Sequence, residues 1–398
     1  MSVFDLPLQL MRLSKRYLDF SNQIAVDFEW HRRQGGLGLG PLSARLIEQT
    51  RLLKSSAICA EDYYHLGLYR GELSFEQKRS FLGSYQKWRY FDRINPPVYD
   101  VLARDKALFH IFADSHGIPT PETLATTAPG TKPYFGLRLD TAGAVRQFLQ
   151  DHHGEDLFFK PADGSLGEGA LAVGPDGSST RAWIELPSQT ATDVEGILQH
   201  LTPGGKLGRF LVQRRLRPHQ LFADIVPHVC PTVRIMTLCT ERGVEFLGAA
   251  VRIGSGRSAT DNVAGGGLIA PITMRTGLLQ RAYCLDDGIP KPTDVHPLTG
   301  ASLPRVETPE WGKIQTLVAE SAQRFNFLPC IGWDIGITDG GPVVIEINTR
   351  PRCVSVQTAA PHGLLQGPLG RELAKTAGRL GNGLSIDPRH AQSDPQPA

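Results

Sequence analysis

The feature that most constrains this chain is a pair of strand-like runs within residues 332–348, joined by the turn sequence Thr338-Asp339-Gly340-Gly341-Pro342. Side chains alternate between the two faces of a strand, so Glu346 and Asn348 are expected on one face. The opposite face is expected to be apolar and to carry Val343, Ile345 and Ile347. The segment is therefore predicted to form a hairpin with one polar and one apolar face.

A turn centred on Gly340 would place Asp334 directly opposite Glu346, with Asn348 one step along the same face. Like charges in opposed positions destabilise a sheet, so a cation between the two carboxylates is the simplest explanation. Carboxylate and amide oxygens are hard ligands, which suit Mg²⁺ or Mn²⁺ better than Zn²⁺. The alternative is an ordinary hairpin with two carboxylates on its solvent-facing side.

Composition indicates small molecules as the partners of this chain. The sequence has 398 residues, with 42 Lys and Arg against 40 Asp and Glu, and a net charge of +2. That length has room for two or three domains, and the balanced charge does not indicate nucleic acid or an acidic membrane as a partner. The sequence leaves a homodimer open.

The amino-terminal sequence Met1-Ser2-Val3-Phe4-Asp5 lacks the pattern of a signal peptide, and no apolar run is long enough to cross a bilayer. The six cysteines are scattered, without the spacing of metal ligands. A cytoplasmic protein with reduced cysteines and no membrane span is therefore expected.

A glycine-rich segment follows the predicted strand 157–161. Lys160 lies at the end of this strand, and Gly164, Gly167 and Gly169 come just after it. Glycines let the backbone approach an anion closely, and a lysine supplies a positive charge, so the segment is a candidate phosphate-binding loop. It matches neither the Walker A motif nor the dinucleotide fingerprint, and a plain surface turn is the alternative. A second lysine, Lys106, lies at the start of a predicted helix.

Two arginines lie inside apolar strands: Arg234 in residues 232–236 and Arg252 in residues 249–253. Charged groups are rarely buried without a partner, so each is expected to face an anion. That anion is either a carboxylate of the protein or a ligand.

Together these residues resemble the ATP-grasp superfamily. The resemblance rests on Lys106, on Lys160 before the glycine loop, on a hinge strand near Gln213, and on the set Asp334, Glu346 and Asn348. The chain is most similar to the sugar-transfer-associated ATP-grasp branch, which is related to alpha-L-glutamate ligases. The motifs that carry this closer likeness are Gln213, His219, Pro231-Thr232-Val233-Arg234, Arg252-Ile253-Gly254, Asp261-Asn262, Gly265-Gly266-Gly267 and Gly332-Trp333-Asp334.

The resemblance implies an α+β ATP-grasp fold, in which two α+β subdomains grip ATP, with a helical region before them. The expected segments are residues 1–100 (helical), 101–210 (first subdomain with the phosphate flap), 211–381 (second subdomain with the metal site) and 382–398 (disordered tail). Helix-like spacing within the first segment is carried by Leu10, Leu13 and Tyr17, and by Leu42, Leu46 and Leu53. Its many aromatic residues are interpreted as packing surface.

The resemblance also implies roles for single residues. Those assigned to ATP are Lys106, Lys160, Gly164, Ser165, Gly167, Gly169, Gln213 and His219. Asp334, Glu346 and Asn348 would hold the metal, Arg234 and Arg252 would act on the transferred phosphoryl group or the acceptor carboxylate, and Asp261 and Asn262 would lie on the acceptor side. The hinge has Gln213 followed by Arg214 where many members of the superfamily have a carboxylate.

The function implied is an ATP-dependent carboxylate–amine ligase. It would form an amide through an acyl phosphate, with ATP as co-substrate, a small-molecule carboxylate and an amine as substrates, and a place in natural-product or polysaccharide-related biosynthesis. Two alternatives remain open: a phosphotransferase acting on a small-molecule acceptor, and a nucleotide-binding regulatory module. Phosphoryl transfer needs charge neutralisation more than a nucleophilic side chain, so the metal and the lysines would serve either enzyme.

Overall fold

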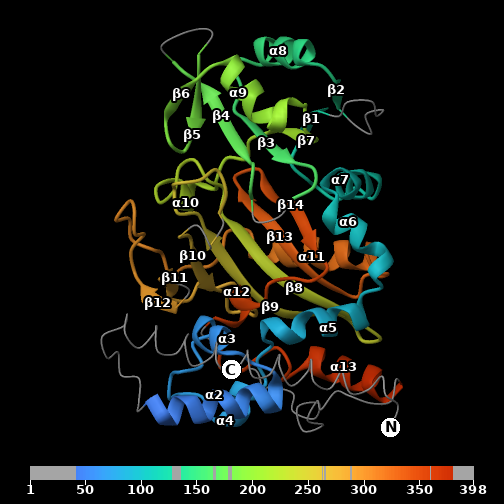
Figure 1. The fold of residues 1–398 in the computed structure, drawn as a ribbon, viewed down its shortest axis with the longest axis vertical. Helices are drawn as coiled ribbons and strands as arrows, with labels where there is room; N and C mark the ends of the chain where they lie inside the picture. Colours follow the sequence, from blue (N-terminus) through green and yellow to red (C-terminus); the bar gives the residue numbers. More distant parts are fainter. Residues whose placement is uncertain are drawn as a thin grey trace, which may run out of the picture. The chain divides into compact units, whose positions relative to one another are not determined.

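A computed structural model of the protein describes residues 42–127, 136–164, 167–177, 182–261, 263, 266–286, 289–358 and 360–379. The chain forms two units (Figure 1). The first consists of Met1–Ile94, Asp287–Pro290 and Arg352–Ala398, and the second of Asn95–Asp286 and Lys291–Pro351. The division into segments at residues 100, 210 and 381 stays a prediction, and the helical pattern of Leu10, Leu13 and Tyr17 and the predicted tail lie outside the described residues.

Helices make up most of the described part of the first unit. They are α2 (Leu42–Ser56), α3 (Ala60–His65), α4 (Phe75–Arg79), α5 (Ser84–Ile94), α12 (Val354–Gln357) and α13 (Pro368–Arg379). This confirms the predicted helical region near the amino terminus. Tyr63, Tyr64 and Phe81 are fully buried in its core, as the interpretation of the aromatic residues as packing surface requires.

Segments far apart in the sequence join within this first unit. The buried amide of Gln357 accepts hydrogen bonds from the backbone N–H groups of Leu82 and Leu364, at 2.9 and 3.0 Å, and donates to the carbonyl of Leu82 at 3.0 Å. A side chain that satisfies three buried backbone groups fixes its neighbours firmly, because leaving such groups unpaired is costly.

The first sheet of the second unit has seven strands, in the order β2-β1-β7-β3-β4-β5-β6. The strands are β1 (Thr123–Thr127), β2 (Leu137–Leu139), β3 (Leu157–Pro161), β4 (Leu171–Pro175), β5 (Trp183–Leu186), β6 (Thr190–Thr192) and β7 (Phe210–Arg214). Helices α8 (Ala142–Asp151) and α9 (Val194–Leu201) contribute buried residues to the core of this sheet, with the short helix η2 (Pro203–Gly205) after them. In Figure 1 these strands and helices are coloured teal to light green.

The second sheet also has seven strands, in the order β12-β11-β10-β9-β8-β13-β14. They are β8 (Thr232–Thr240), β9 (Gly243–Ile253), β10 (Leu268–Pro271), β11 (Ala282–Asp286), β12 (Ile289–Thr293), β13 (Cys330–Thr338) and β14 (Gly341–Asn348). Its core includes Trp311, Ile314 and Val318 of α11 (Trp311–Arg324), which pack on the strands. The remaining helices are η1 (Pro97–Asp100), α6 (Val101–Arg104), α7 (Lys106–Ser115) and α10 (Gln220–Ala223).

The predicted α+β class is confirmed, and the elements expected from the sequence around the candidate site are present. Asp105 caps α7, because its carboxylate accepts hydrogen bonds from the N–H groups of Ala107 and Leu108. The strand predicted at residues 157–161 corresponds to β3, and the hinge strand expected near Gln213 corresponds to β7. The strands expected around Arg234 and Arg252 correspond to β8 and β9.

The hairpin of β13 and β14 has the predicted register at its polar end and a different turn. Asp334 pairs with Glu346 and Gly332 with Asn348, whereas Thr338 pairs with Gly341 across a two-residue turn. The difference of one residue is absorbed by a β-bulge, where the pairing moves from Asp334–Glu346 to Ile335–Val344. The expected pairing therefore holds at Asp334, although the turn is not centred on Gly340.

The bulge also corrects the assignment of the hairpin's faces. Val344 and Ile347 belong to the core of the sheet, but Val343 and Ile345 do not. A Cβ placed on Gly336 would lie within 3.4 Å of both Val343 and Ile345, so these two side chains lie on the polar face. The expectation that Val343 and Ile345 share the apolar face with Ile347 was wrong, because an extra residue in a strand reverses its alternation beyond that point.

Candidate functional site

Three of the five predicted site residues on the second sheet, Arg234, Arg252 and Asp334, are linked through one buried carboxylate. Asp334 is 2% exposed and lies opposite Arg234 of β8 and Glu346 of β14. The guanidinium of Arg234 binds it with two hydrogen bonds, from Nε to Oδ1 and from Nη2 to Oδ2, the latter at 2.9 Å. Arg252 of β9 approaches the same Oδ2 with its Nη2 at 3.0 Å. Asp334 is therefore held between two arginines.

Arg252 also connects this centre to the loop between β9 and β10. Its Nε donates to Asp261 Oδ2 at 3.0 Å and to the hydroxyl of Thr232 at 3.1 Å, and Thr232 in turn donates to Asp261. Each buried arginine thus faces a carboxylate of the protein, which is one of the two partners expected from the sequence. Asn262, predicted beside Asp261 on the acceptor side, lies outside the described residues.

The two opposed carboxylates have pKa values shifted in opposite directions. Burial alone would raise the pKa of Asp334, but Arg234 and Arg252 outweigh it and hold the pKa below its usual value. For Glu346, burial and the neighbouring charge of Asp334 raise the pKa, and the opposing effects of Lys106 and Lys160 are smaller. The arginines therefore stabilise one carboxylate, while the other would gain most from an additional cation.

The chemistry of Glu346 and Asn348 fits a divalent cation, and that of Asp334 fits it less well. Glu346 is the carboxylate with the raised pKa, and Asn348 donates from its amide nitrogen to the carbonyl of Gly332 at 3.5 Å, an orientation that keeps its amide oxygen as the ligand atom. Both oxygens of Asp334 already accept from arginines. Within the described residues no cluster of three His, Cys, Asp or Glu side chains suits a metal, so a site here would also depend on the amide of Asn348.

Two lysines converge on this region from different elements. The ammonium of Lys106, at the start of α7, donates to the carbonyl of Gly164 at 2.8 Å. Lys160, at the end of β3, is 6% exposed and donates to the carbonyl of Ile345 at 3.3 Å, next to Glu346. Burial lowers the pKa of Lys160 to about 8, with Glu346 acting in the opposite direction. The structure thus brings Lys106, Lys160, Gly164 and Glu346 together.

The glycine loop lies against the loop that carries Asp261. Gly167 has a φ of +72°, and a Cβ on it would lie 2.7 Å from the hydroxyl oxygen of Thr260. Only glycine meets both conditions at this position without strain. Gly169 also has a positive φ, of +71°, whereas the predicted phosphate-loop residue Ser165 lies outside the described residues.

His110 is a residue of this centre that the sequence reasoning missed. It lies on α7, is 3% exposed, and its Nε2 is 3.5 Å from the Lys160 ammonium and 3.2 Å from the Gln213 amide nitrogen. The available signal was its position four residues after Lys106, which places both on one face of a helix.

The two residues predicted to meet adenine lie in different surroundings. Gln213 is buried, and its amide nitrogen also donates to the hydroxyl of Thr123 at 3.0 Å. The Nδ1 of His219 accepts a hydrogen bond from the N–H of Leu221 and so caps α10, while its Nε2 lies 4.0 Å from Asp339 at the turn of the hairpin. The side chains of Leu216, Val343 and Ile345 each lie within 3.4 Å of the position that a Cβ on Gly336 would take.

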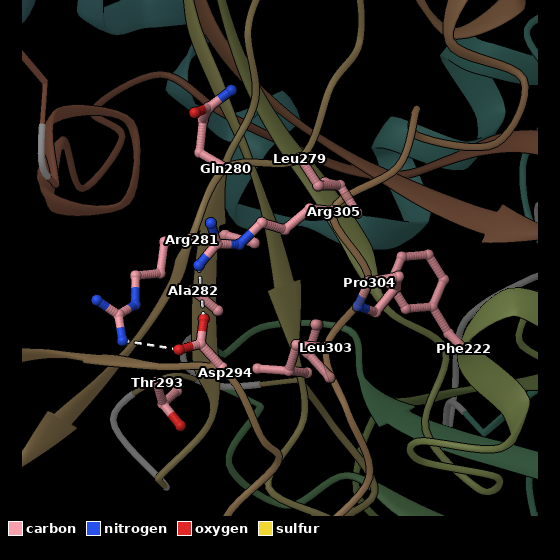
Figure 2. Close-up of a pocket in the computed structure, with 12 residues that line it drawn as sticks. Phe222, Leu279, Gln280, Arg281, Ala282, Thr293, Asp294, Leu303, Pro304 and Arg305 are labelled. Carbon is pink, nitrogen blue, oxygen red and sulfur yellow. Dashed lines mark hydrogen bonds and ion pairs between the residues drawn. The ribbon is translucent and has the colours of Figure 1, made fainter.

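A separate small pocket in the second unit contains none of the predicted site residues. It is lined by Phe222, Ile253, Ala270, Leu279, Gln280, Arg281, Ala282, Thr293, Asp294, Leu303, Pro304 and Arg305. Figure 2 shows Asp294 between Arg281 and Arg305, each of which donates to it at 2.7 Å. Arg281, Asp294 and Arg305 are thus paired with one another and exposed to solvent. They would contribute little to the binding of a ligand, because exposed ion pairs are weak.

None of the six cysteines is joined in a disulfide bond. Among the described residues, no helix is long and apolar enough to cross a bilayer.

Comparison with known proteins identifies the family. The sequence profile of the sugar-transfer associated ATP-grasp family matches residues 85–369. No curated protein matches the chain. Among solved structures, D-cycloserine synthetase DcsG is 17% identical, with a TM-score of 0.36, over 72% of this chain and 74% of that chain.

Two further structures show similarity at the same level. An ATP-grasp RimK domain protein from Sphaerobacter thermophilus is 16% identical, with a TM-score of 0.34, over 65% of this chain and 66% of that one. The biotin carboxylase domain of 2-oxoglutarate carboxylase from Hydrogenobacter thermophilus is 13% identical, with a TM-score of 0.34, over 63% of this chain and only 40% of that chain. The family profile spans far more than half of the sequence, and on that ground the chain belongs to the sugar-transfer associated ATP-grasp family.

Proposed function

We propose that the protein is an ATP-dependent carboxylate–amine ligase that forms an amide bond and releases ADP and phosphate. The observation that carries the proposal is the convergence of Lys106 and Lys160 on the glycine loop and on the strand of Glu346. Two ammonium groups beside a carboxylate that lacks a full counter-charge suit the polyphosphate of a metal-bound nucleotide.

In the proposed reaction, a carboxylate oxygen of the acceptor attacks the γ-phosphorus of ATP. The bond from that phosphorus to the β–γ bridging oxygen breaks, and ADP leaves. The amine nitrogen then attacks the acyl carbon, the carbon–oxygen bond to phosphate breaks, and the amine loses a proton. Lys106 and Lys160 would hold the phosphates, while Mg²⁺ or Mn²⁺ at Glu346 and Asn348 would neutralise phosphate charge.

Arg252 would meet the acceptor carboxylate in this proposal. It now binds Asp261, a carboxylate on a loop, whereas Arg234 is committed to the buried Asp334. An acceptor carboxylate could take the place of Asp261 without any change in the strands. Asp261 would thus act on the acceptor side, as the family resemblance implies, by exchanging places with it.

Phosphorus NMR with Mg-ATP and a mixed pool of amino acids, amino sugars and small carboxylates tests this function. We expect ADP and free phosphate only when both an acid and an amine are present. A new phosphoester signal would overturn the ligase in favour of a phosphotransferase. Nucleotide binding without turnover in any pool would leave a regulatory module as the function.

The variant Glu346→Gln tests the metal assignment in the same assay. It keeps the shape of the side chain and removes its charge, so we expect turnover to fall by about a hundredfold or more. Glu320→Gln, at an exposed position of α11, is the control and should turn over normally. Full activity in Glu346→Gln would remove Glu346 from the metal site.

A further inference from the structure

His110 is a buried polar side chain at this centre that the proposed reaction does not use. It lies one helical turn after Lys106 in α7, and the edge of its ring faces the end of β3. The beginning of α7 is tied to the same region, because the N–H of Lys106 donates to the carbonyl of Ala162 at 2.8 Å. The helix therefore presents Lys106 to the glycine loop and His110 to Lys160.

The partners of His110 decide which tautomer it has. The ammonium of Lys160 and the amide nitrogen of Gln213 are both donors only, and both approach Nε2, at 3.5 and 3.2 Å. The Nε2 atom must therefore accept, which places the ring proton on Nδ1 and makes the imidazole neutral. A protonated imidazole would direct an N–H at both donors.

Gln213 gives this acceptor a fixed position. Its amide nitrogen donates to His110 and, at 3.0 Å, to Thr123 of β1, while its backbone pairs with Phe158 of β3. The imidazole is thus held between a helix and two adjacent strands. Lys160 has a flexible four-carbon stem, so an acceptor held in this way limits where its ammonium can lie.

We propose that His110 is a positioning residue that fixes the Lys160 ammonium for phosphate binding by accepting its hydrogen bond. This role deepens the proposed function, since it concerns the same lysine. His110 acts through Lys160 and needs no contact with nucleotide. Its role is therefore visible only when Lys160 is present.

A double-mutant cycle tests this dependence. His110→Met and His110→Gln have similar length, but only Gln keeps an acceptor, and Lys160→Met removes the ammonium. Mg-ATP affinity is measured by calorimetry in wild type, in each single variant and in the His110→Met/Lys160→Met double variant. The free energy of unfolding is measured in the same proteins.

We expect His110→Met to weaken Mg-ATP binding by about tenfold, the effect of one hydrogen bond to a charged group. His110→Gln should restore most of the affinity, and His110→Met should have no further effect once Lys160 is Met. Equal weakening with and without Lys160, or no rescue by Gln, would overturn the proposal. If His110→Met does not fold, His110→Phe replaces it in the cycle.

His152→Leu serves as the control. His152 ends α8 and stacks on Phe148, with Nδ1 2.9 Å from the Phe148 carbonyl, so its loss should leave Mg-ATP affinity unchanged.

Failure of the proposed function would be distinguishable from failure of the positioning role. If wild type does not bind Mg-ATP, the ligase proposal fails, and the unfolding cycle still decides whether His110 and Lys160 are coupled: additive effects on stability would overturn the positioning role.

Discussion

His110 and Glu346 illustrate what burial does to single side chains near this site. Burial lowers the pKa of His110 to about 2, with Lys160 adding to the effect, whereas burial raises the pKa of Glu346. Both shifts favour the neutral form of the side chain. The two residues differ in their partners. The neutral imidazole of His110 already accepts from Lys160 and Gln213, whereas the carboxylate of Glu346 would be stabilised by a bound cation.

The depressed pKa of His110 predicts a loss of stability in acid. The unfolded chain binds a proton at this residue below pH 6.5 and the folded protein does not, so the free energy of unfolding falls as the pH drops below 6.5. At pH 5 this one residue accounts for about 2 kcal/mol. Urea unfolding at pH 7 and pH 5 should therefore show a smaller acid loss in His110→Gln than in wild type. Equal losses in the two proteins would show that His110 is protonated in the fold.

The spacing from Lys106 placed His110 on the same helical face, but its role could not be predicted from the sequence, because that role depends on residues far away in the chain. Lys160 and Gln213 are 50 and 103 positions from it. Lys106, Lys160 and Glu346 carried a recognisable pattern, and the structure brings them together. By contrast, a histidine in an amphipathic helix has the same local sequence whether it packs in a core or supports a lysine.

At the scale of elements, the hairpin of β13 and β14 shows that side-chain alternation predicts the face of a residue only where the strand has no bulge. The pairing of Asp334 with Glu346 was predicted correctly, whereas Val343 and Ile345 were predicted on the wrong face. A single bulge accounts for both results, since it corrects the register after a shorter turn and reverses the alternation on the turn side. No residue in the sequence marks a bulge at this point, because Ile345 suits either face.

The glycine loop is the element for which a backbone substitution has the clearest expected effect. Gly167→Ala forces a side chain onto a residue with φ of +72° and brings its Cβ to 2.7 Å from Thr260. We expect the free energy of unfolding to fall by about 1 kcal/mol or more and Mg-ATP affinity to fall with it. The free energy of unfolding is measured by chemical denaturation, and the Mg-ATP affinity by calorimetry.

Gly154→Ala is the matched control for this substitution. A Cβ on Gly154 meets nothing within 4 Å, and its φ lies outside the positive region. The free energy of unfolding of Gly154→Ala should equal that of the wild type or be slightly higher. If Gly167→Ala were as harmless as Gly154→Ala, the glycine loop would not need its present conformation.

At the scale of the molecule, every predicted site residue belongs to the second unit, Asn95–Asp286 with Lys291–Pro351. A ligand that binds only the folded form raises the free energy of unfolding of the unit that binds it, by about 2.7 kcal/mol when the ligand is present at a hundred times its Kd. Hydrogen exchange with and without Mg-ATP should therefore slow in the second unit and stay unchanged in the first. EDTA should cancel the effect, and protection confined to the first unit would contradict the placement of the site.

The makeup of the first unit has a consequence for the order of folding during synthesis. The second unit comes from residues 95–286 and 291–351, two stretches separated only by residues 287–290. The first unit needs Leu82 and Gln357 together, and these are 275 positions apart. A ribosome releases the whole second unit before Gln357 emerges, so the helices that precede the second unit cannot complete their packing until the residues that follow it have been made.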